Sequence, residues 1–141
     1  GRRINDYMPK WVVEQIILLM AKKGIVILNS KVLILGLTFK EDCPDIRNTK
    51  VFDINNNLKG FGINTKIVDP LANKQEVKKT YDLDINNKID FSCKYSAVIL
   101  AVGHTYFKEL KTHQWKQLID DKGFFFDLKY IIPRNLNPER I

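Results

Sequence analysis

The sequence predicts an α/β fold in which helices cover a mostly parallel sheet, and three observations support this prediction. Short segments expected to be strands recur at residues 31–36, 63–68, 97–102 and 124–128, and those at 31–36 and 97–102 contain buried apolar runs. Segments with helical spacing separate these runs, and strands that alternate with helices imply a parallel sheet with right-handed crossovers. The length of 141 residues is near the common size of a single domain, so the chain can bury one core.

The first expected element is a helix near the amino terminus, for which Gly24 is a natural stop. Pro9 is compatible with the first turn if Asp6 caps the helix, whereas it marks a kink if the helix begins before Gly1. The apolar stripe of this helix is wide for one domain, so we expect an exposed patch and self-association of the chain. The stripe consists of Met8, Trp11, Val12, Ile16 and Leu19.

A strand, a helix and a second strand are expected next. Residues 31–36 form the first strand, and residues 48–59 form a helix that a pair of glycines ends. Residues 63–68 form the second strand, and the Asp-Pro pair after it forces a turn.

The second half of the chain continues the alternation with less clarity. Residues 74–79 predict a short helix, and the Asn-rich residues 83–90 are interpreted as a loop or a minor strand. A helix at 106–119 is expected between the two remaining strands, 97–102 and 124–128. The tail from residue 129 onward is expected to be irregular.

The charge balance favours anionic partners. There are 23 basic and 16 acidic residues, which give a net charge of +7. The basic residues are spread along the chain, however, without a basic helix or the aromatic motif of RNA-binding sheets. The pattern therefore favours a nucleotide over nucleic acid, and much of the excess charge is interpreted as solvated surface.

Several classes of protein are disfavoured by what the sequence lacks. The longest apolar stretches are far shorter than a membrane span, and no signal peptide or lipidation motif is visible, so we expect a cytoplasmic protein. The two cysteines, Cys43 and Cys93, have no framework spacing and are interpreted as inert thiols in a reducing compartment. No cluster of His, Cys and carboxylate residues has the spacing of a metal site.

The most informative stretch runs from residue 32 to residue 50, VLILGLTFKEDCPDIRNTK. A buried run meets Gly36, and a polar loop with Lys40 and Arg47 follows. Polar groups at the carboxyl end of a central parallel strand lie where open α/β sheets bind ligands. Lys and Arg can hold phosphate there, the Arg through a two-pronged contact. The alternative is a solvated loop whose charges pair with one another.

The stretch GLTFKEDCPDIRNTK resembles the signature of the carboxyl-terminal domain of the UDP-glucose/GDP-mannose dehydrogenase family. In that signature a strand ends in Gly, and Phe-Lys and Asp-x-x-Asp-x-Arg-x-Ser/Thr follow. GRRINDYMP resembles the end of the long helix that joins the two halves of the family's enzymes, and YSAVILAVGHTYFKEL resembles a later strand and loop. The resemblance covers nearly the whole chain. The motifs GLTFK, CPD and RNTK are most similar to those of enzymes that oxidise UDP-N-acetylhexosamines.

This resemblance implies a domain organisation. Residues 1–24 would be the end of the central connecting helix, and residues 25–141 would be the carboxyl-terminal UDP-sugar-binding domain. The fold would then be a Rossmann-like three-layer domain with a mostly parallel sheet, preceded by part of a long connecting helix.

The resemblance also implies a function, namely the UDP-sugar-binding domain of an NAD-dependent nucleotide-sugar 6-dehydrogenase. The substrate would be UDP-N-acetylglucosamine or UDP-N-acetylgalactosamine, and the uronic acid formed would serve surface polysaccharide synthesis. The full-length enzyme would be a homodimer or higher oligomer. The alternatives are a UDP-glucose or GDP-mannose 6-dehydrogenase domain, or a non-catalytic nucleotide-binding module.

The sequence lacks two features on which the family's hydride chemistry depends. No G-x-G-x-x-G fingerprint follows a strand, and neither cysteine has the Gly-rich context of the family's nucleophile. The chain is therefore expected to be an excised domain with no catalytic residue of its own. We expect it to fold alone without reducing NAD, and the NAD-binding half would belong to the same enzyme.

Three candidate site residues follow from the resemblance. Phe39 and Lys40 match the family's Phe-Lys pair, which contacts the nucleotide sugar, and Arg47 matches the Arg that reaches toward NAD. The alternatives are core packing for Phe39 and a surface cation for Lys40. For Arg47 the alternative is an ion pair with Asp42 or Asp45, and the two roles of Arg47 can hold together. Asp45 is as well suited to ordering the loop or capping the next helix as to touching a ligand.

Weaker candidates lie elsewhere in the chain. Asn5 belongs to a stretch that resembles a family feature near the substrate, although a capping role fits it equally. His104 follows a buried strand at the expected ligand edge, yet without a partner Cys or Asp at catalytic spacing it gives no mechanism. Tyr106 follows the same strand. A basic residue near the carboxyl end, Arg134 or Arg140, would meet the substrate by analogy with the family.

Overall fold

The computed structural model of the chain describes residues 9–140. The strands in this range form one four-stranded sheet. The strand order is β2-β1-β3-β4, and every strand pair among the described residues is parallel. This confirms the predicted α/β fold. The strands are β1 (Lys31–Leu35), β2 (Asn64–Val68), β3 (Tyr95–Leu100) and β4 (Ile119–Asp127).

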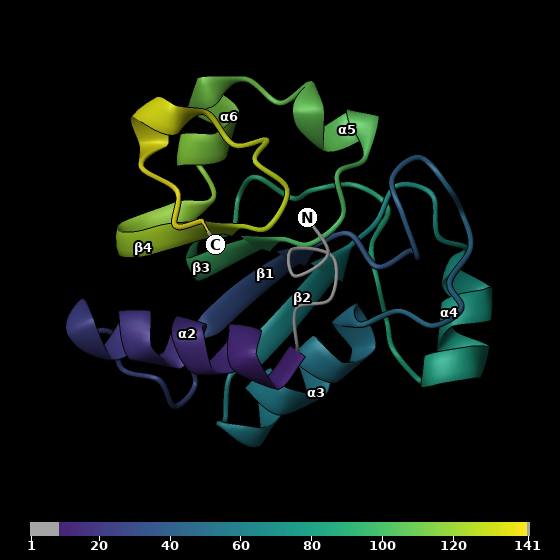
Figure 1. Cartoon of the computed structure of the whole chain (residues 1–141), viewed down its shortest axis with the longest axis horizontal. Coiled ribbons are helices and arrows are strands. Elements are labelled where there is room, and N and C mark those ends of the chain that lie inside the picture. Colours follow the sequence, from purple (N-terminus) through teal and green to yellow (C-terminus); the bar gives the residue numbers. More distant parts are fainter. Residues whose placement is uncertain (1–8, 141) are drawn as a thin grey trace.

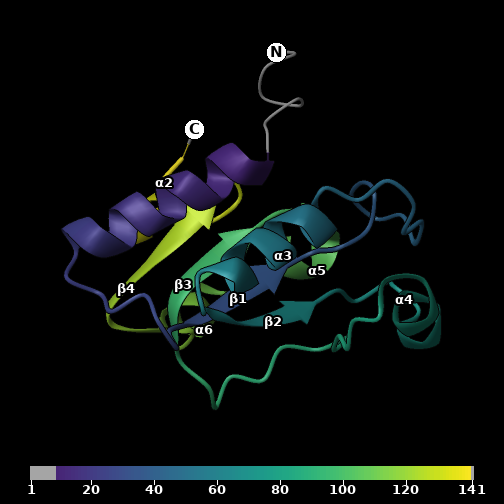
Figure 2. The ribbon, with the colours of Figure 1, turned by 90° about the horizontal axis from the view of Figure 1, so that it is seen from below.

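Helices α2 (Pro9–Lys22) and α3 (Val51–Gly60) cover one face of the sheet (Figures 1 and 2). Successive residues of a strand point to opposite faces, so Val32 and Ile34 of β1 join the core under these helices. Gly24, with a φ of +72°, follows α2 and is the predicted stop.

The apolar side of α2 packs on its own domain. Val12, Val13, Ile16 and Met20 are buried, whereas Trp11 and Leu18 are 39% and 48% exposed. Val12, Ile16 and Leu19 of the stripe therefore pack against the core of the same chain. Self-association through the exposed Trp11 stays a prediction. Met8, Asp6 and Gly1, on which the expected start of this helix depended, lie outside the described residues.

Helices α5 (Thr105–Lys108) and α6 (Thr112–Lys116) cover the opposite face and complete the three layers. Phe107 and Trp115 are fully buried against strand residues such as Leu35 and Phe125. The rings of Trp115 and Phe125 meet edge to face, with centroids 5.9 Å apart.

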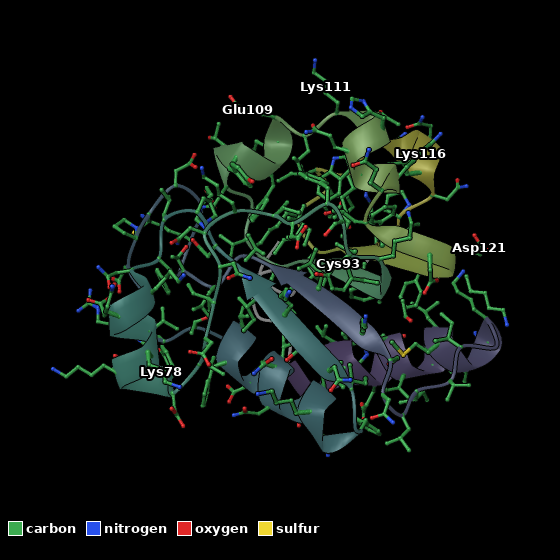
Figure 3. The ribbon with its side chains drawn as sticks, turned by 180° about the vertical axis from the view of Figure 1, so that it is seen from behind. Lys78, Cys93, Glu109, Lys111, Lys116 and Asp121 are labelled. Carbon is green, nitrogen blue, oxygen red and sulfur yellow. The ribbon has the colours of Figure 1, made fainter. Side chains whose placement is uncertain are left out.

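The prediction of one helix over residues 106–119 was wrong. The backbone of Lys111 is extended, and its N–H donates to Oε1 of Gln114 at 2.8 Å, so a new helix begins after it. The charged side chains at this break, Glu109 and Lys111, point away from the sheet (Figure 3). The last strand also begins at Ile119, earlier than expected, because Ile119 pairs with Tyr95 before a shift in register.

The remaining segments flank the sheet. Helix α4 (Lys74–Tyr81) lies beyond β2 and extends the predicted short helix, and Asn73 caps it by accepting the N–H of Glu76. Residues 83–90 are a loop with one bridge, between Asn86 and Val68.

The tail after β4 contains a 3₁₀ turn, η1 (Arg134–Leu136), and one bridge from Glu139 to Phe126. It is otherwise irregular, as predicted. Among residues 9–140, no helix is long and apolar enough to cross a membrane.

Candidate functional site

The carboxyl edge of the sheet has a crevice between β1 and β3. The chain leaves β1 toward α3 on one face and leaves β3 toward α5 on the other, so the two connections diverge. Open α/β sheets bind ligands at such a point. Gly36 permits the close approach of the two connections, because a Cβ there would lie 2.5 Å from Cβ of Val102.

A cavity of about 430 Å³ opens in this crevice. Three lysines, Lys40, Lys50 and Lys129, line it together with Phe39. Phe39 is 58% exposed, which is against the core-packing alternative for this residue. The cavity is therefore positively charged and carries an exposed aromatic ring, features that suit an anionic ligand with a ring. It is lined by Thr38, Phe39, Lys40, Glu41, Asn48, Thr49, Lys50, Val51, Ala101, Val102 and Lys129.

Sequence reasoning missed Lys129 as a lining residue. Its signal was its position, because it comes two residues after the end of β4 and thus at the same edge as Lys40. Its backbone N–H donates to Oδ1 of Asp127 at 3.0 Å. Asp127 is fully buried, so it fixes the start of the segment that carries this lysine.

Arg47 lies at a different cavity, of about 830 Å³, between its loop and α4. Its Nη2 lies 2.7 Å from Oδ2 of Asp45, and its Nε also donates to that carboxylate. This two-pronged contact holds the pKa of Asp45 at about 2. The alternative that Arg47 pairs with Asp45 is confirmed, and the structure does not bring Arg47 to the cavity of Lys40.

Asp45 orders its loop and does not cap the next helix. Its carboxylate accepts the N–H of Arg47, and its carbonyl accepts the N–H of Phe39 at 2.7 Å. The first turn of α3 is instead closed by Thr49, whose Oγ1 accepts the N–H of Val51 at 3.1 Å.

Beneath the lysine cavity lies a buried polar pair, Asp69 and His104. Nε2 of His104 lies 2.9 Å from Oδ2 of Asp69, and the two residues are 1% and 0% exposed. Burial by itself raises the pKa of Asp69, but hydrogen bonds from His104 and from the amides of Leu37, Thr38 and Leu71 outweigh it and lower the pKa. Asp69 therefore remains an anion inside the core.

His104 was predicted as a weak candidate because no partner was visible in the sequence. Its partners come from other strands: Asp69 follows β2, and Asp42 follows β1. Since each connection begins at the carboxyl edge of a parallel sheet, three distant segments meet there. Only the strand order made this cluster visible.

Two of the other weak candidates, Arg140 and Tyr106, have structural partners. Nη2 of Arg140 lies 3.1 Å from Oδ2 of Asp127 and donates to the carbonyl of Ile132 at 2.6 Å, which holds the tail in place. Tyr106 accepts the N–H of Ile89 at 3.2 Å through its hydroxyl. Arg134 lies in η1, and Asn5 lies outside the described residues.

Among residues 9–140, no group of three or more His, Cys, Asp or Glu side chains is arranged to hold a metal ion. The three lysines that line the cavity suit the electrostatic binding and positioning of an anionic ligand. The lysines supply charge, and the buried network beneath them supplies rigidity.

Comparison with known proteins gives consistent matches. The chain is 41% identical over 141 residues to UDP-N-acetyl-D-glucosamine 6-dehydrogenase of Salmonella typhi, covering all of this chain and 33% of the relative. It is 41% identical over 132 residues to protein CapL of Staphylococcus aureus, covering 94% and 31%. The chain thus spans about a third of the length of these relatives.

A solved structure gives the same architecture. The NDP-N-acetyl-D-galactosaminuronic acid dehydrogenase of Methanosarcina mazei Go1 superposes with a TM-score of 0.79 at 21% identity, over 96% of this chain and 28% of that one. At this identity the likeness concerns the fold. The sequence model described as the UDP binding domain of the UDP-glucose/GDP-mannose dehydrogenase family matches residues 33–134, which include the end of β1, the loop with Lys40, and β4. The chain therefore belongs to the UDP-glucose/GDP-mannose dehydrogenase family, as its UDP binding domain.

Proposed function

We propose that this chain binds the UDP end of a UDP-sugar for an NAD-dependent nucleotide-sugar 6-dehydrogenase. The observation that carries the proposal is the cavity at the carboxyl edge of β1 and β3, which three lysines line. The match to a UDP binding domain covers the same loop. The resemblance to enzymes of UDP-N-acetylhexosamines, at 41% identity, favours UDP-N-acetylglucosamine or UDP-N-acetylgalactosamine as the substrate.

In this proposal the residues of the chain bind and position. Lys40 and Lys129 neutralise the diphosphate, and the exposed ring of Phe39 offers an apolar surface beside it. Binding energy gained at the diphosphate, remote from the reacting carbon, holds the sugar in the orientation that the chemistry requires. No described residue is assigned a covalent role.

Arg47 is the residue that would hold NAD, which supplies the hydride acceptor when bound. The residues fit this role, because the side chain of Arg47 is 84% exposed and Asp45 fixes its orientation at the 830 Å³ cavity. The separate positions of Arg47 and Lys40 suit two ligands rather than one.

Further parts of the proposal concern the whole enzyme. The NAD-binding half and the nucleophile would lie outside these 141 residues, residues 1–24 would end a connecting helix, and residues 25–141 would form the UDP-sugar-binding domain. The enzyme would be a cytoplasmic homodimer or higher oligomer that supplies uronic acids for surface polysaccharide.

Calorimetric titration of the 141-residue chain tests the binding proposal. UDP, UDP-N-acetylglucosamine and UDP-N-acetylgalactosamine should bind, and GDP-mannose should bind more weakly. With NAD and any of these sugars the chain should form no NADH. Turnover by the chain would contradict the domain assignment. An absence of UDP binding would contradict the proposal that the chain binds UDP-sugars.

A further inference from the structure

The loop that carries Phe39 and Lys40 is anchored at both ends by one buried bridge. We propose that His104 is a positioning residue that fixes residues 38–42 and thereby sets the affinity of the lysine cavity for a nucleoside diphosphate. The proposal rests on the proposed function for its ligand, but the geometry of the anchor does not depend on it.

The amino end of the loop is held by Asp69. Oδ2 of Asp69 accepts the N–H groups of Leu37 at 2.6 Å and of Thr38 at 3.0 Å. Its Oδ1 accepts two further N–H groups, from Leu71 and Ala72, in the turn after β2. A fully buried carboxylate with these donors is a rigid point relative to the sheet.

The carboxyl end of the loop is held at Asp42 by the residues after β3. The N–H of Asp42 donates to Nδ1 of His104 at 2.9 Å. The carboxylate of Asp42 accepts the N–H and the hydroxyl of Thr105, at 2.8 and 2.7 Å. These bonds lower the pKa of Asp42, the backbone N–H contributing most, so both the backbone and the side chain of residue 42 are fixed.

His104 joins the two ends. Because Nδ1 accepts an N–H, the ring proton lies on Nε2, which donates toward Oδ2 of Asp69 at 2.9 Å. Nε2 also lies 3.0 Å from Oγ1 of Thr38, and that hydroxyl donates to the carbonyl of Lys40 at 3.1 Å. The imidazole therefore uses both nitrogens. Nδ1 holds the carboxyl end of the loop, and Nε2 bonds to the buried carboxylate that binds the amino end directly.

The exposed part of the loop depends on these anchors. Phe39, Lys40 and Glu41 are exposed and line the cavity, whereas Asp69 and His104, which hold the loop from below, are buried. A loop fixed before binding loses less conformational entropy when the ligand arrives. If the loop is correctly placed in only a fraction of molecules, the apparent affinity falls by that fraction.

Two substitutions distinguish the contact made by Nδ1 of His104 from the contact made by its Nε2. In His104→Asn the amide oxygen replaces Nδ1 and can accept the N–H of Asp42, but the bond to Asp69 is lost. In His104→Gln the amide nitrogen replaces Nε2 and can donate to Asp69, but the acceptor for Asp42 is lost. The loop is positioned by the first contact and the core is held by the second, so the two variants should fail in different ways.

Titration with UDP and thermal melting give the readout. We expect His104→Gln to weaken UDP binding about five- to ten-fold with a melting temperature close to that of the wild type. We expect His104→Asn to keep UDP affinity within about two-fold and to melt at a lower temperature. Equal losses of affinity in both variants would mean that His104 acts only through the stability of the core, and the proposal would be wrong.

Amide hydrogen exchange without ligand tests the anchor independently of UDP. The amides of residues 39–42 should exchange faster in His104→Gln and at the wild-type rate in His104→Asn; the same rate in both variants overturns the proposal. If the wild type binds no UDP, the proposed function fails while this measurement still decides the anchor. If His104→Asn does not fold, Thr105→Val is compared with His104→Gln instead: both variants keep a donor to Asp69 and loosen Asp42, so both should speed exchange of residues 39–42, and wild-type exchange in His104→Gln overturns the proposal.

Discussion

Lys40 and Arg47 lie in the same loop after β1 but are held by different means. Lys40 lies between residues tied to Asp69, His104 and Thr105, which belong to the connections after β2 and β3. Arg47 is held by Asp45, two residues before it, in an exposed pair. Its segment meets the rest of the chain at Ile46, whose carbonyl accepts the hydroxyl of Tyr81 at 2.5 Å.

The difference shows how a position is specified. A buried anion that binds several backbone N–H groups places a loop relative to the whole sheet, and little solvent screens it. An exposed ion pair between near neighbours fixes the shape of a few residues and contributes little to stability. The segment of Lys40 is therefore pre-organised, whereas the orientation of Arg47 depends mainly on a local contact.

The largest effect should follow removal of the buried anion. Asp69→Ala leaves His104 and the N–H groups of two connections without their acceptor, so we expect a loss of about 3–5 kcal/mol in the free energy of unfolding. Urea denaturation measures it. Asp45→Ala is the matched control and should leave the midpoint nearly unchanged; similar losses in both variants would remove the contrast between the two anchors.

The next effect concerns the ligand. In the full-length enzyme Lys40→Ala should lower the affinity for UDP-sugar by about 1.5 to 3 kcal/mol, or roughly ten- to a hundred-fold, because a charged contact is lost. Affinity for NAD should change little. Lys59→Ala, at the exposed end of α3, is the control for loss of one positive charge. Equal losses in the two variants would mean that only the net charge matters.

The free energy of unfolding should fall at acid pH because the buried Asp69 becomes protonated. The pKa of Asp69 is lower in the folded chain than its usual value of 3.8, so its contribution is present above about pH 4 and is lost as pH falls through the lowered pKa. Denaturation at several pH values measures this slope. Asp69→Asn should flatten the slope at both low and high salt, whereas Asp45→Asn should change it only at low salt. An unchanged slope in Asp69→Asn would contradict the assignment of an ionised Asp69.

The smallest effect on the chain itself should come from Arg47→Ala. The side chain is exposed and its partner is local, so the melting temperature should stay close to that of the wild type. In the full-length enzyme this variant should weaken NAD and leave UDP-sugar affinity nearly unchanged. Melting curves and separate titrations with each ligand check it, and a loss for UDP-sugar alone would reverse the roles given to Arg47 and Lys40.

Much of the fold was predictable because its strands carry their own signals. The apolar runs at β1 and β3 were read correctly, since a central strand buried on both faces is apolar without interruption. The edge strand β2 and the end of β4 were also predicted, although β2 has polar residues at 64–66. The break at Lys111 was not, because the apolar residues on either side of it fit a helical period and the cap is a side-chain contact of Gln114. A local period cannot report such a contact.

The candidate site also has features that neighbouring residues reveal and features that depend on the folded arrangement. The α/β class, the loop with Lys40 and Arg47, and the resemblance to the family follow from the amino-acid sequence, because these depend on residues that are neighbours along the chain. The folded arrangement was needed to show that Lys129 joins Lys40 at one cavity and that Arg47 lies at another. It also decided that Asp69 and His104, 35 residues apart, form the bridge beneath the loop. The physical reason is strand order: a parallel sheet gathers the carboxyl ends of distant strands at one edge, and the sequence does not state which strands are neighbours.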